Sequence, residues 1–224
     1  MRLLSIFDVD RTITRKPTYS LFLLFAMRRH APWRALLLPL LLPVALAYAA
    51  GIVSRSTMKE AMHRVALGRH VPREKAHALA EAFAERLFRG GLYPQAVERM
   101  AAERAAGRTV MLATAASALY IEPLARRLGI ADVVATAGVH EGEGLTHRIA
   151  GANCYGSAKL AMIVAALQDR GIARDGAHIR FFTDHASDQA VCEWADEPFA
   201  VNPSPRMLAL ARRERWPVLD WRGA

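Results

Sequence analysis

The chain has 224 residues, 53% of them hydrophobic and 23% charged, and a formal net charge of +9. This length suits one α/β domain with an insertion or two small domains, and the composition excludes an intrinsically disordered chain. The two cysteines, Cys154 and Cys192, form neither a CxxC motif nor a disulfide framework, so we expect reduced thiols in a cytosolic protein.

The first predicted element is an apolar strand at 3–8, which the N-terminus enters at once, so we expect no secretory signal. The stretch that follows shows only helical patterns, at 17–31, 35–54, 54–67 and 72–89. We therefore interpret residues 15–91 as an all-helical cap, inserted into a catalytic core made of residues 1–14 and 92–224.

After the cap, strand-like and helix-like runs alternate. The predicted strands cover 109–114, 178–184 and 199–203, and the predicted helices cover 94–107, 117–129, 157–171 and 204–215. A hairpin is expected from 132–139 to 145–151, turning through HEGEG. This alternation predicts an α/β fold in which a Rossmann-like parallel sheet is covered by helices.

Polar residues stand where several predicted strands end. Asp8, Thr114 and Asp184 occupy such positions, and open α/β sheets place their sites at the carboxyl ends of parallel strands. Asp10 follows Asp8 by two residues, so in extended geometry both carboxylates face the same side. We expect these residues to share one site.

Further residues suit the binding of an anion at this edge. Thr114 offers a hydroxyl, and the turn that begins at Ala115 offers backbone N–H groups. Lys159 falls near a helix start, where a cation opposes the helix dipole, and Asp188 adds a carboxylate after Asp184. Each residue alone also fits a plain structural role, such as a helix cap. Together their hard oxygen ligands suit Mg²⁺, and the set suits a phosphoryl group held between metal and lysine.

The order FDxDxT, then Thr after a strand, then Lys, then D-x-x-x-D resembles the haloacid dehalogenase superfamily, in its phosphoserine phosphatase-like branch. This resemblance implies a phosphomonoester hydrolase. It makes Asp8 the nucleophile that forms an aspartyl-phosphate, and Asp10 the general acid for the leaving alcohol and then the base for water. Thr114, Ala115 and Lys159 would hold the phosphoryl oxygens.

The same resemblance implies a Mg²⁺ ion. Asp184, Asp8 and the backbone carbonyl of Asp10 would ligate it, while Asp188 would orient the metal shell or Lys159. Metal and lysine would neutralise the charges of nucleophile and phosphate.

Asp10 favours phosphate chemistry, because a dehalogenating relative would lack this second Asp. It needs a proton at working pH, so its neighbours should raise its pKa. Two positions depart from the family pattern: Arg11 replaces the glycine that is frequent before the threonine, and Ser187 stands where phosphoserine phosphatases usually carry Asn.

The segment 35–54 has no charged residue, yet it lies in the most basic part of the chain. Residues 11–75 hold 12 Lys and Arg against Glu60 and Glu74, a local net of +10. A single membrane crossing is excluded, because it would separate Asp8 from Asp184 across the bilayer. The stretch 19–27 is too short for a second crossing.

Two interpretations of 35–54 remain. It is either a buried helix of the cap over the catalytic mouth, or a monotopic anchor in one leaflet with flanking arginines at headgroup level. A small cap cannot easily shield so much apolar surface, so we favour an anionic membrane surface as the partner, at the cytoplasmic face of the inner membrane. Homo-oligomer formation through the apolar face is the main competitor, and nucleic acid is not expected as a partner.

The pattern of the insertion is similar to that of the phosphatidylglycerophosphatase C family in the same branch: an aromatic-rich short helix, a basic turn, then a Leu/Pro-rich run. This likeness implies a phospholipid headgroup as substrate, with phosphatidylglycerophosphate converted to phosphatidylglycerol. The alternative is a soluble phosphatase for a small metabolite such as phosphoserine or histidinol phosphate.

Overall fold

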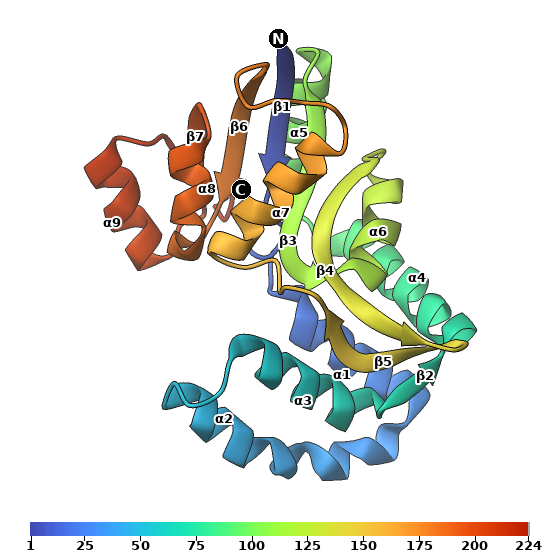
Figure 1. Ribbon diagram of the computed structural model, residues 1–224. Helices are drawn as coiled ribbons and strands as arrows, with labels where there is room; N and C mark the ends of the chain where they lie inside the picture. The colour runs from blue at the N-terminus through green and yellow to red at the C-terminus, as the bar shows by residue number, and fades with distance from the viewer. Residues whose placement is uncertain (224) are drawn as a thin grey trace.

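The computed structural model describes residues 1–223, which form one mixed sheet with helices on both faces (Figure 1). The strands are β1 Arg2–Phe7, β2 His70–Pro72, β3 Thr109–Ser117, β4 Asp132–Glu141, β5 Gly144–Ala150, β6 Ala177–Thr183, β7 Glu197–Val201 and β8 Val218–Leu219. The α-helices are α1 Thr18–His30, α2 Leu42–Ala49, α3 Arg55–Leu67, α4 Arg73–Gly90, α5 Pro94–Ala105, α6 Ala118–Arg127, α7 Ser157–Gln168, α8 Gln189–Trp194 and α9 Pro205–Glu214. Two 3₁₀ helices are η1 Pro32–Leu41 and η2 Ala186–Asp188.

The strand order is β2-β5-β4-β3-β1-β6-β7-β8. All neighbouring pairs are parallel except β4 with β5 and β5 with β2. This arrangement confirms the predicted α/β fold with a mostly parallel, helix-covered sheet. The central strand β1 lies between β3 and β6, and Phe7 is in register with Leu112 and Phe182. Asp8 and Asp184, which follow β1 and β6, and Thr114, which lies in the last part of β3, therefore stand side by side at this edge of the sheet.

Alternation along β1 divides the core into two layers. Phe7 packs in one layer with residues of α5 and α6, while Ile6 packs in the other with residues of α7, α8 and α9. Both side chains are fully buried. Because successive side chains of a strand point to opposite faces, each apolar strand supports helices on both sides.

The inserted segment, residues 15–91, lies beyond the carboxyl ends of β1 and β3 (Figure 1). Its two ends are adjacent, because Thr14 and Leu92 form an isolated antiparallel bridge. Its last helix, α4, packs against α6, where Arg127 pairs with Glu81 and Glu85. One helix of the insertion therefore extends the helical layer of the core.

The prediction that this segment is all-helical is wrong at one place. His70–Pro72 forms β2, which pairs with β5 and extends the sheet, and Val71 is buried opposite Leu145. Gly68 ends α3 with a positive φ of 99°, and α4 starts after Pro72. The short link between them is thus extended, and it satisfies backbone groups that β5 would otherwise leave unpaired at the sheet edge.

The apolar run is not one straight helix. It divides into η1 and α2, with Pro39 inside η1 and Pro43 in the first turn of α2. Proline removes an N–H donor and crowds the preceding turn, which explains the break. Among the described residues one helical stretch, Pro32–Ala49, is long and apolar enough by length and composition to cross a membrane, with mean hydropathy 1.5.

None of the residues of η1 and α2 is buried. Leu36 is 83% exposed, and Leu42 and Leu46 are each 62% exposed. The interpretation of this run as a buried cap helix is therefore wrong. We call residues 32–53 the apolar ridge. The start of the ridge is held by Arg34, whose guanidinium donates to the carbonyls of Arg64 and Val65 at the end of α3.

Candidate active site

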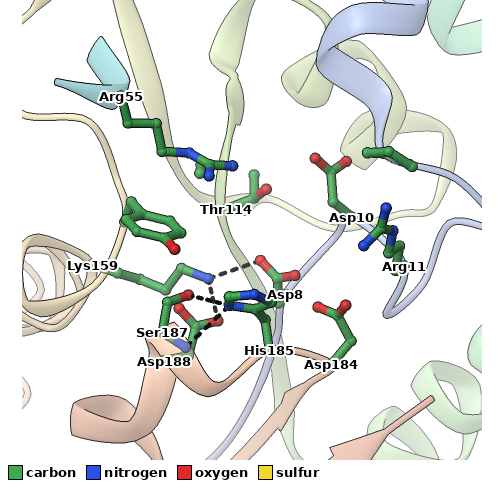
Figure 2. Close-up of a pocket in the computed structure, with 13 residues that line it drawn as sticks. Asp8, Asp10, Arg11, Arg55, Thr114, Lys159, Asp184, His185, Ser187 and Asp188 are labelled. Atoms are coloured by element: carbon green, nitrogen blue, oxygen red, sulfur yellow. Dashed lines mark hydrogen bonds and ion pairs between the residues drawn. The ribbon is translucent and has the colours of Figure 1, made fainter. Parts of the chain in front are cut away.

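A cavity of about 300 Å³ opens where β1, β3 and β6 end. It contains all seven predicted site residues, which come from segments far apart in the sequence: Asp8, Asp10, Thr114, Ala115, Lys159, Asp184 and Asp188. Figure 2 shows their side chains converging from the strand ends and from α7. The structure therefore brings the predicted residues together, while their individual roles stay predictions.

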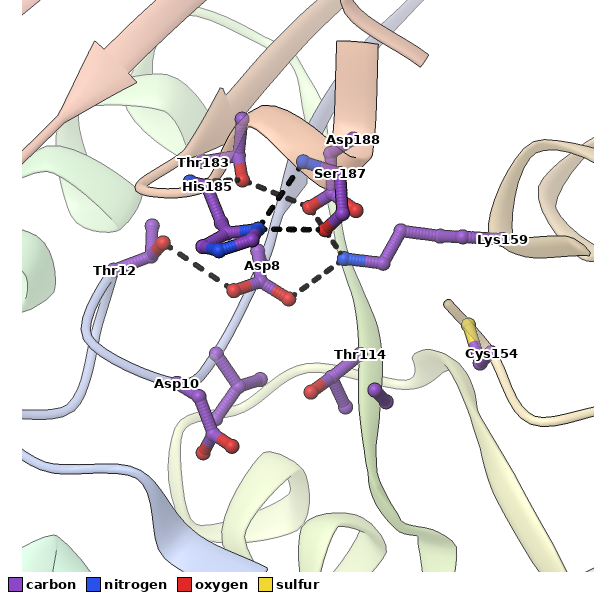
Figure 3. Close-up of polar contacts among 12 residues, drawn as sticks. Asp8, Asp10, Thr12, Thr114, Cys154, Lys159, Thr183, His185, Ser187 and Asp188 are labelled. Carbon is purple, nitrogen blue, oxygen red and sulfur yellow. Dashed lines mark hydrogen bonds and ion pairs between the residues drawn. The ribbon is translucent and has the colours of Figure 1, made fainter. Parts of the chain in front are cut away.

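Lys159 is the centre of the polar contacts. Its Nζ donates to Asp8 Oδ1 at 2.8 Å and to Asp188 Oδ2 at 2.6 Å (Figure 3). Thr183 also donates to Asp188 Oδ2, at 2.8 Å. Burial lowers the pKa of Lys159, but the charges of Asp8 and Asp188 outweigh it and raise the pKa above its ordinary value. Lys159 therefore stays cationic in a buried site.

Asp8 has the position expected of a nucleophile. Its side chain is nearly buried, and Thr12 Oγ1 lies 3.4 Å from Oδ2. Burial raises the pKa of Asp8 to about 7, opposed by the charge of Lys159. Without a further cation, the carboxylate is therefore only partly ionised near neutral pH.

Asp10 lines the same cavity, but its carboxylate points away from the Lys159 contacts (Figure 3). Asp10 Oδ1 accepts hydrogen bonds from the N–H of Thr18 at 2.8 Å and from its Oγ1 at 2.7 Å. Burial raises the pKa of Asp10, and the Thr18 hydrogen bonds oppose the rise. A carboxyl with a raised pKa next to a nucleophile is suited to general acid–base work.

The carboxylates present fit a divalent cation of the Mg²⁺ type. Burial, with the charges of Asp8 and Asp188, raises the pKa of Asp184 to about 8, and Asp188 Oδ1 is buried with no hydrogen-bond partner in residues 1–223. A bound cation would favour the ionised form of Asp184, and one of its water ligands would give Asp188 Oδ1 a hydrogen-bond partner. No three His, Cys, Asp or Glu side chains of the described chain form a metal-ligand group. The family resemblance implies the Asp10 backbone carbonyl as the third donor, and the Asp10 side chain itself is engaged by Thr18.

Comparison with known proteins identifies the family of the chain. A family model described as haloacid dehalogenase-like hydrolase matches residues 6–193, which include every predicted site residue. The chain belongs to this family. The family membership confirms the resemblance to the haloacid dehalogenase superfamily drawn from the FDxDxT, Thr, Lys and D-x-x-x-D order.

Solved structures share the hydrolase's whole fold. A protein of unknown function from Bordetella pertussis Tohama I has a TM-score of 0.86 at 25% identity, with 99% of each chain covered. A phospho-aspartyl intermediate analogue of phosphoserine phosphatase has a TM-score of 0.63 at 15% identity, covering 99% of this chain and 94% of that one. This second likeness shows the fold alone.

Curated relatives match over a shorter stretch. A probable phosphatase of Mycobacterium tuberculosis is 27% identical over 130 residues, which are 58% of this chain and 44% of that protein. The hydrolase thus spans less than half the length of this relative.

Sequence reasoning missed part of the wall of the hydrolase's cavity. Arg55, the first residue of α3, and Tyr155 line it, with the guanidinium 4.3 Å from the ring centroid. In the sequence Arg55 stands only as a basic residue directly after the apolar run, and nothing local links it to Tyr155. His185 also lines the cavity; its Nδ1 accepts from the N–H of Ser187 at 3.1 Å, and burial lowers its pKa.

Arg11 lines the cavity beside Asp184 (Figure 2). Its φ of 61° lies in the left-handed region, which explains why glycine is frequent at this position in the family. Asn202 supports the turn by donating from Nδ2 to the Arg11 carbonyl at 3.2 Å. The signal in the sequence was the departure from glycine itself.

Proposed function

We propose that this hydrolase is a Mg²⁺-dependent phosphomonoesterase that works through an aspartyl-phosphate at Asp8. The observation that carries the proposal is the buried Lys159 ammonium, which contacts both Asp8 and Asp188 beside the Asp184 carboxylate. A carboxylate can attack a phosphate dianion only if the negative charges of both groups are offset. Bound Mg²⁺ would supply the remaining positive charge and polarise the phosphoryl oxygens.

The first step forms a bond from an Asp8 oxygen to phosphorus and breaks the bond to the alcohol oxygen. Asp10 gives its proton to the departing alkoxide. In the second step Asp10 takes a proton from water, and the water oxygen attacks phosphorus. The acyl-phosphate bond breaks, which releases inorganic phosphate and restores the Asp8 carboxylate. The raised pKa of Asp10 suits both directions of this proton transfer.

The phosphoryl group would rest between Lys159 and the end of β3 at Thr114 and Ala115, where the strand continues to Ser117 in place of the predicted turn. Thr114 and Ala115 line the cavity on the side of β3, and the β3–β4 register shifts between Thr114 and Ser117. This irregularity frees backbone groups from the sheet ladder, so that they are available to an anion.

For the substrate, we propose a lipid phosphate presented by an anionic membrane surface at the cytoplasmic face. The apolar ridge is exposed, and the exposed Arg28 and Arg29 precede it at the end of α1. Each basic residue near an anionic bilayer contributes about 1 kcal/mol. The ridge also leads directly into Arg55 on the cavity wall. A ridge resting on lipid would thus bring the cavity to a headgroup that cannot leave the bilayer.

A small soluble phosphomonoester such as phosphoserine or histidinol phosphate is the second candidate. The comparisons favour this candidate, because several structures with the same fold are phosphoserine phosphatases. The cavity volume of about 300 Å³ also suits a small polar metabolite. In that case the apolar ridge would serve self-association.

Two sets of measurements separate these substrates. Hydrolysis of phosphatidylglycerophosphate in mixed micelles is compared with hydrolysis of phosphoserine and histidinol phosphate. Flotation with vesicles of phosphatidylglycerol and phosphatidylcholine then compares wild type with the Leu42→Glu/Leu46→Glu variant. Phe88→Glu, at an exposed apolar position outside the ridge, is the matched control.

If the substrate is a lipid phosphate, the protein should hydrolyse phosphatidylglycerophosphate in preference to phosphoserine and histidinol phosphate. Wild type and Phe88→Glu should float with the vesicles, and the Leu42→Glu/Leu46→Glu variant should not. A protein that stays in solution and prefers phosphoserine would overturn the lipid proposal in favour of the second candidate. Asp8→Asn should abolish both turnover and trapping by fluoroberyllate with either substrate. Retained turnover in that variant would overturn the nucleophile assignment.

A further inference from the structure

Lys59 is a buried lysine of α3 whose ammonium contacts the core rather than solvent. It is 7% exposed. Its Nζ donates to the Ala115 carbonyl and, at 2.7 Å, to Asn153 Oδ1. Both acceptors are uncharged, so no formal ion pair compensates the burial through these contacts. Burial of a cation among neutral acceptors costs free energy, so packing alone does not explain the position of Lys59.

The acceptors of Lys59 form a small polar cluster with Thr136. The Thr136 hydroxyl lies 3.0 Å from both the Ala115 carbonyl and Asn153 Oδ1. Lys59 also lies over the Tyr19 ring, 5.1 Å from its centroid. Burial lowers the pKa of Lys59 to about 8, so the ammonium keeps its donor hydrogens at neutral pH. The cluster therefore fixes the Ala115 carbonyl from two sides.

This carbonyl belongs to the peptide group that joins Ala115 to Ala116. In a planar trans peptide the C=O and N–H point in opposite directions. Fixing the carbonyl toward Lys59 therefore aims the Ala116 N–H the other way, where it donates to Thr114 Oγ1 at 3.0 Å. With one lone pair engaged, the Thr114 hydroxyl can point its own proton into the cavity.

We propose that Lys59 is a positioning residue: by holding the 115–116 peptide it orients the Thr114 hydroxyl toward the phosphoryl group. The inference rests on the proposed function, which assigns Thr114 to phosphate binding. It also gives α3 two roles, one helical turn apart. Arg55 lines the cavity wall, and Lys59 holds the Ala115 carbonyl behind that wall. The inserted segment thus completes the phosphate site from outside the core.

Steady-state kinetics with p-nitrophenyl phosphate, and calorimetry with inorganic phosphate, test this assignment. Lys59→Met should lower kcat/KM by about 10- to 100-fold, because a small misplacement of a positioning group has effects of that order. It should weaken phosphate binding in the same direction. Lys59→Arg should keep part of the kcat/KM and part of the phosphate affinity, since a guanidinium can still donate to the Ala115 carbonyl. Lys75→Met, at an exposed position of α4, is the control and should match wild type.

A mutant cycle distinguishes positioning from mere support of the fold. If Lys59 acts through Thr114, the Lys59→Met/Thr114→Val variant should be no slower than Thr114→Val alone. Additive losses, or a Lys59→Met variant with wild-type kinetics, would refute the inference. If Lys59→Met does not fold, Thr136→Val replaces it in the cycle, with a smaller loss expected. A wild type without phosphatase activity would instead refute the proposed function, and phosphate calorimetry would still decide the role of Lys59.

Discussion

Asp10 and Thr18 are joined by two hydrogen bonds, from the Thr18 N–H at 2.8 Å and from its Oγ1 at 2.7 Å, both to Asp10 Oδ1. Thr18 is the first residue of α1, and Pro17 before it provides no side-chain cap. The carboxylate therefore accepts from a free N–H at a helix N-terminus, where negative charge is favoured. The proposed acid–base group is thereby held by the inserted segment.

Thr18→Val should change the pH dependence of the reaction. The substitution removes one of the hydrogen bonds that lower the pKa of Asp10, so this pKa should rise further. A hydrogen bond to a charged group contributes about 1.5–3 kcal/mol, which is large enough to be resolved in a pH profile. Because Asp10 must be protonated for the first step, the basic limb of kcat/KM should move to higher pH. Thr109→Val, at an exposed position, should leave the profile unchanged; an unshifted limb in Thr18→Val would exclude Asp10 as its source.

Mg²⁺ should alter the pH dependence of stability. In the metal-free protein the pKa of Asp8 is raised to about 7 and that of Asp184 to about 8. Folded carboxyls with raised pKa values bind more protons than unfolded ones, so the free energy of unfolding should fall as pH rises from about 4 to 8. Thermal unfolding should show this slope in EDTA and a flatter curve in Mg²⁺. Identical curves with and without Mg²⁺ would contradict a cation at Asp8 and Asp184.

Lys159→Met should destabilise the metal-free protein and abolish turnover. Asp8 and Asp188 would be left buried without their shared cation, and loss of one partner from a buried pair costs about 3–5 kcal/mol. The loss should be largest above neutral pH, where Asp8, whose pKa is raised to about 7, is ionised. Denaturant unfolding measures it, with Lys75→Met as the surface control. A Lys159→Met variant as stable as this control would show that the buried charges are not coupled.

Glu103 should stabilise the fold at neutral pH, far from the cavity, and lose this contribution in acid. It is buried and accepts from Ser5 Oγ at 2.7 Å and Arg99 Nε at 2.6 Å, and it pairs with Arg108 at 3.2 Å. Burial raises the pKa of Glu103, but the hydrogen bonds, including one from Arg180, outweigh it and lower the pKa below its ordinary value. The stabilisation is therefore present above the unfolded pKa and lost as pH falls through the folded one.

Substitution of Glu103 by Gln tests this network. Glu103→Gln should lower the free energy of unfolding by about 1–3 kcal/mol at neutral pH, and the difference from wild type should shrink in acid. Glu98→Gln, at an exposed position of the same helix, should have little effect. Chemical unfolding at several pH values gives both quantities. If the free energies of unfolding of wild type and Glu103→Gln differ by the same amount at all pH values, the effect of Glu103 comes from its packing and not from its charge.

Much of the fold and the core of the candidate site could be predicted from local pattern. Asp8, Thr114 and Asp184 were found because each follows an apolar strand, and the rule for parallel sheets places such ends at one edge. The hairpin of β4 and β5 was likewise visible in its turn residues. Strand β2 was missed because three residues carry too little periodicity, and only the open edge of β5 made them extended.

The sequence by itself determined the alternating α/β order and the chemistry-bearing residues of the strand ends, because these depend on patterns within single elements. Only the tertiary structure decided that Asp10 turns to Thr18, that Arg55 and Lys59 reach the cavity and the Ala115 carbonyl behind it, and that the apolar ridge is exposed. Those features arise from contacts between segments 8 to 100 residues apart, or from their absence. Hydrophobic pattern shows how much apolar surface a segment carries, but not whether another segment will cover it.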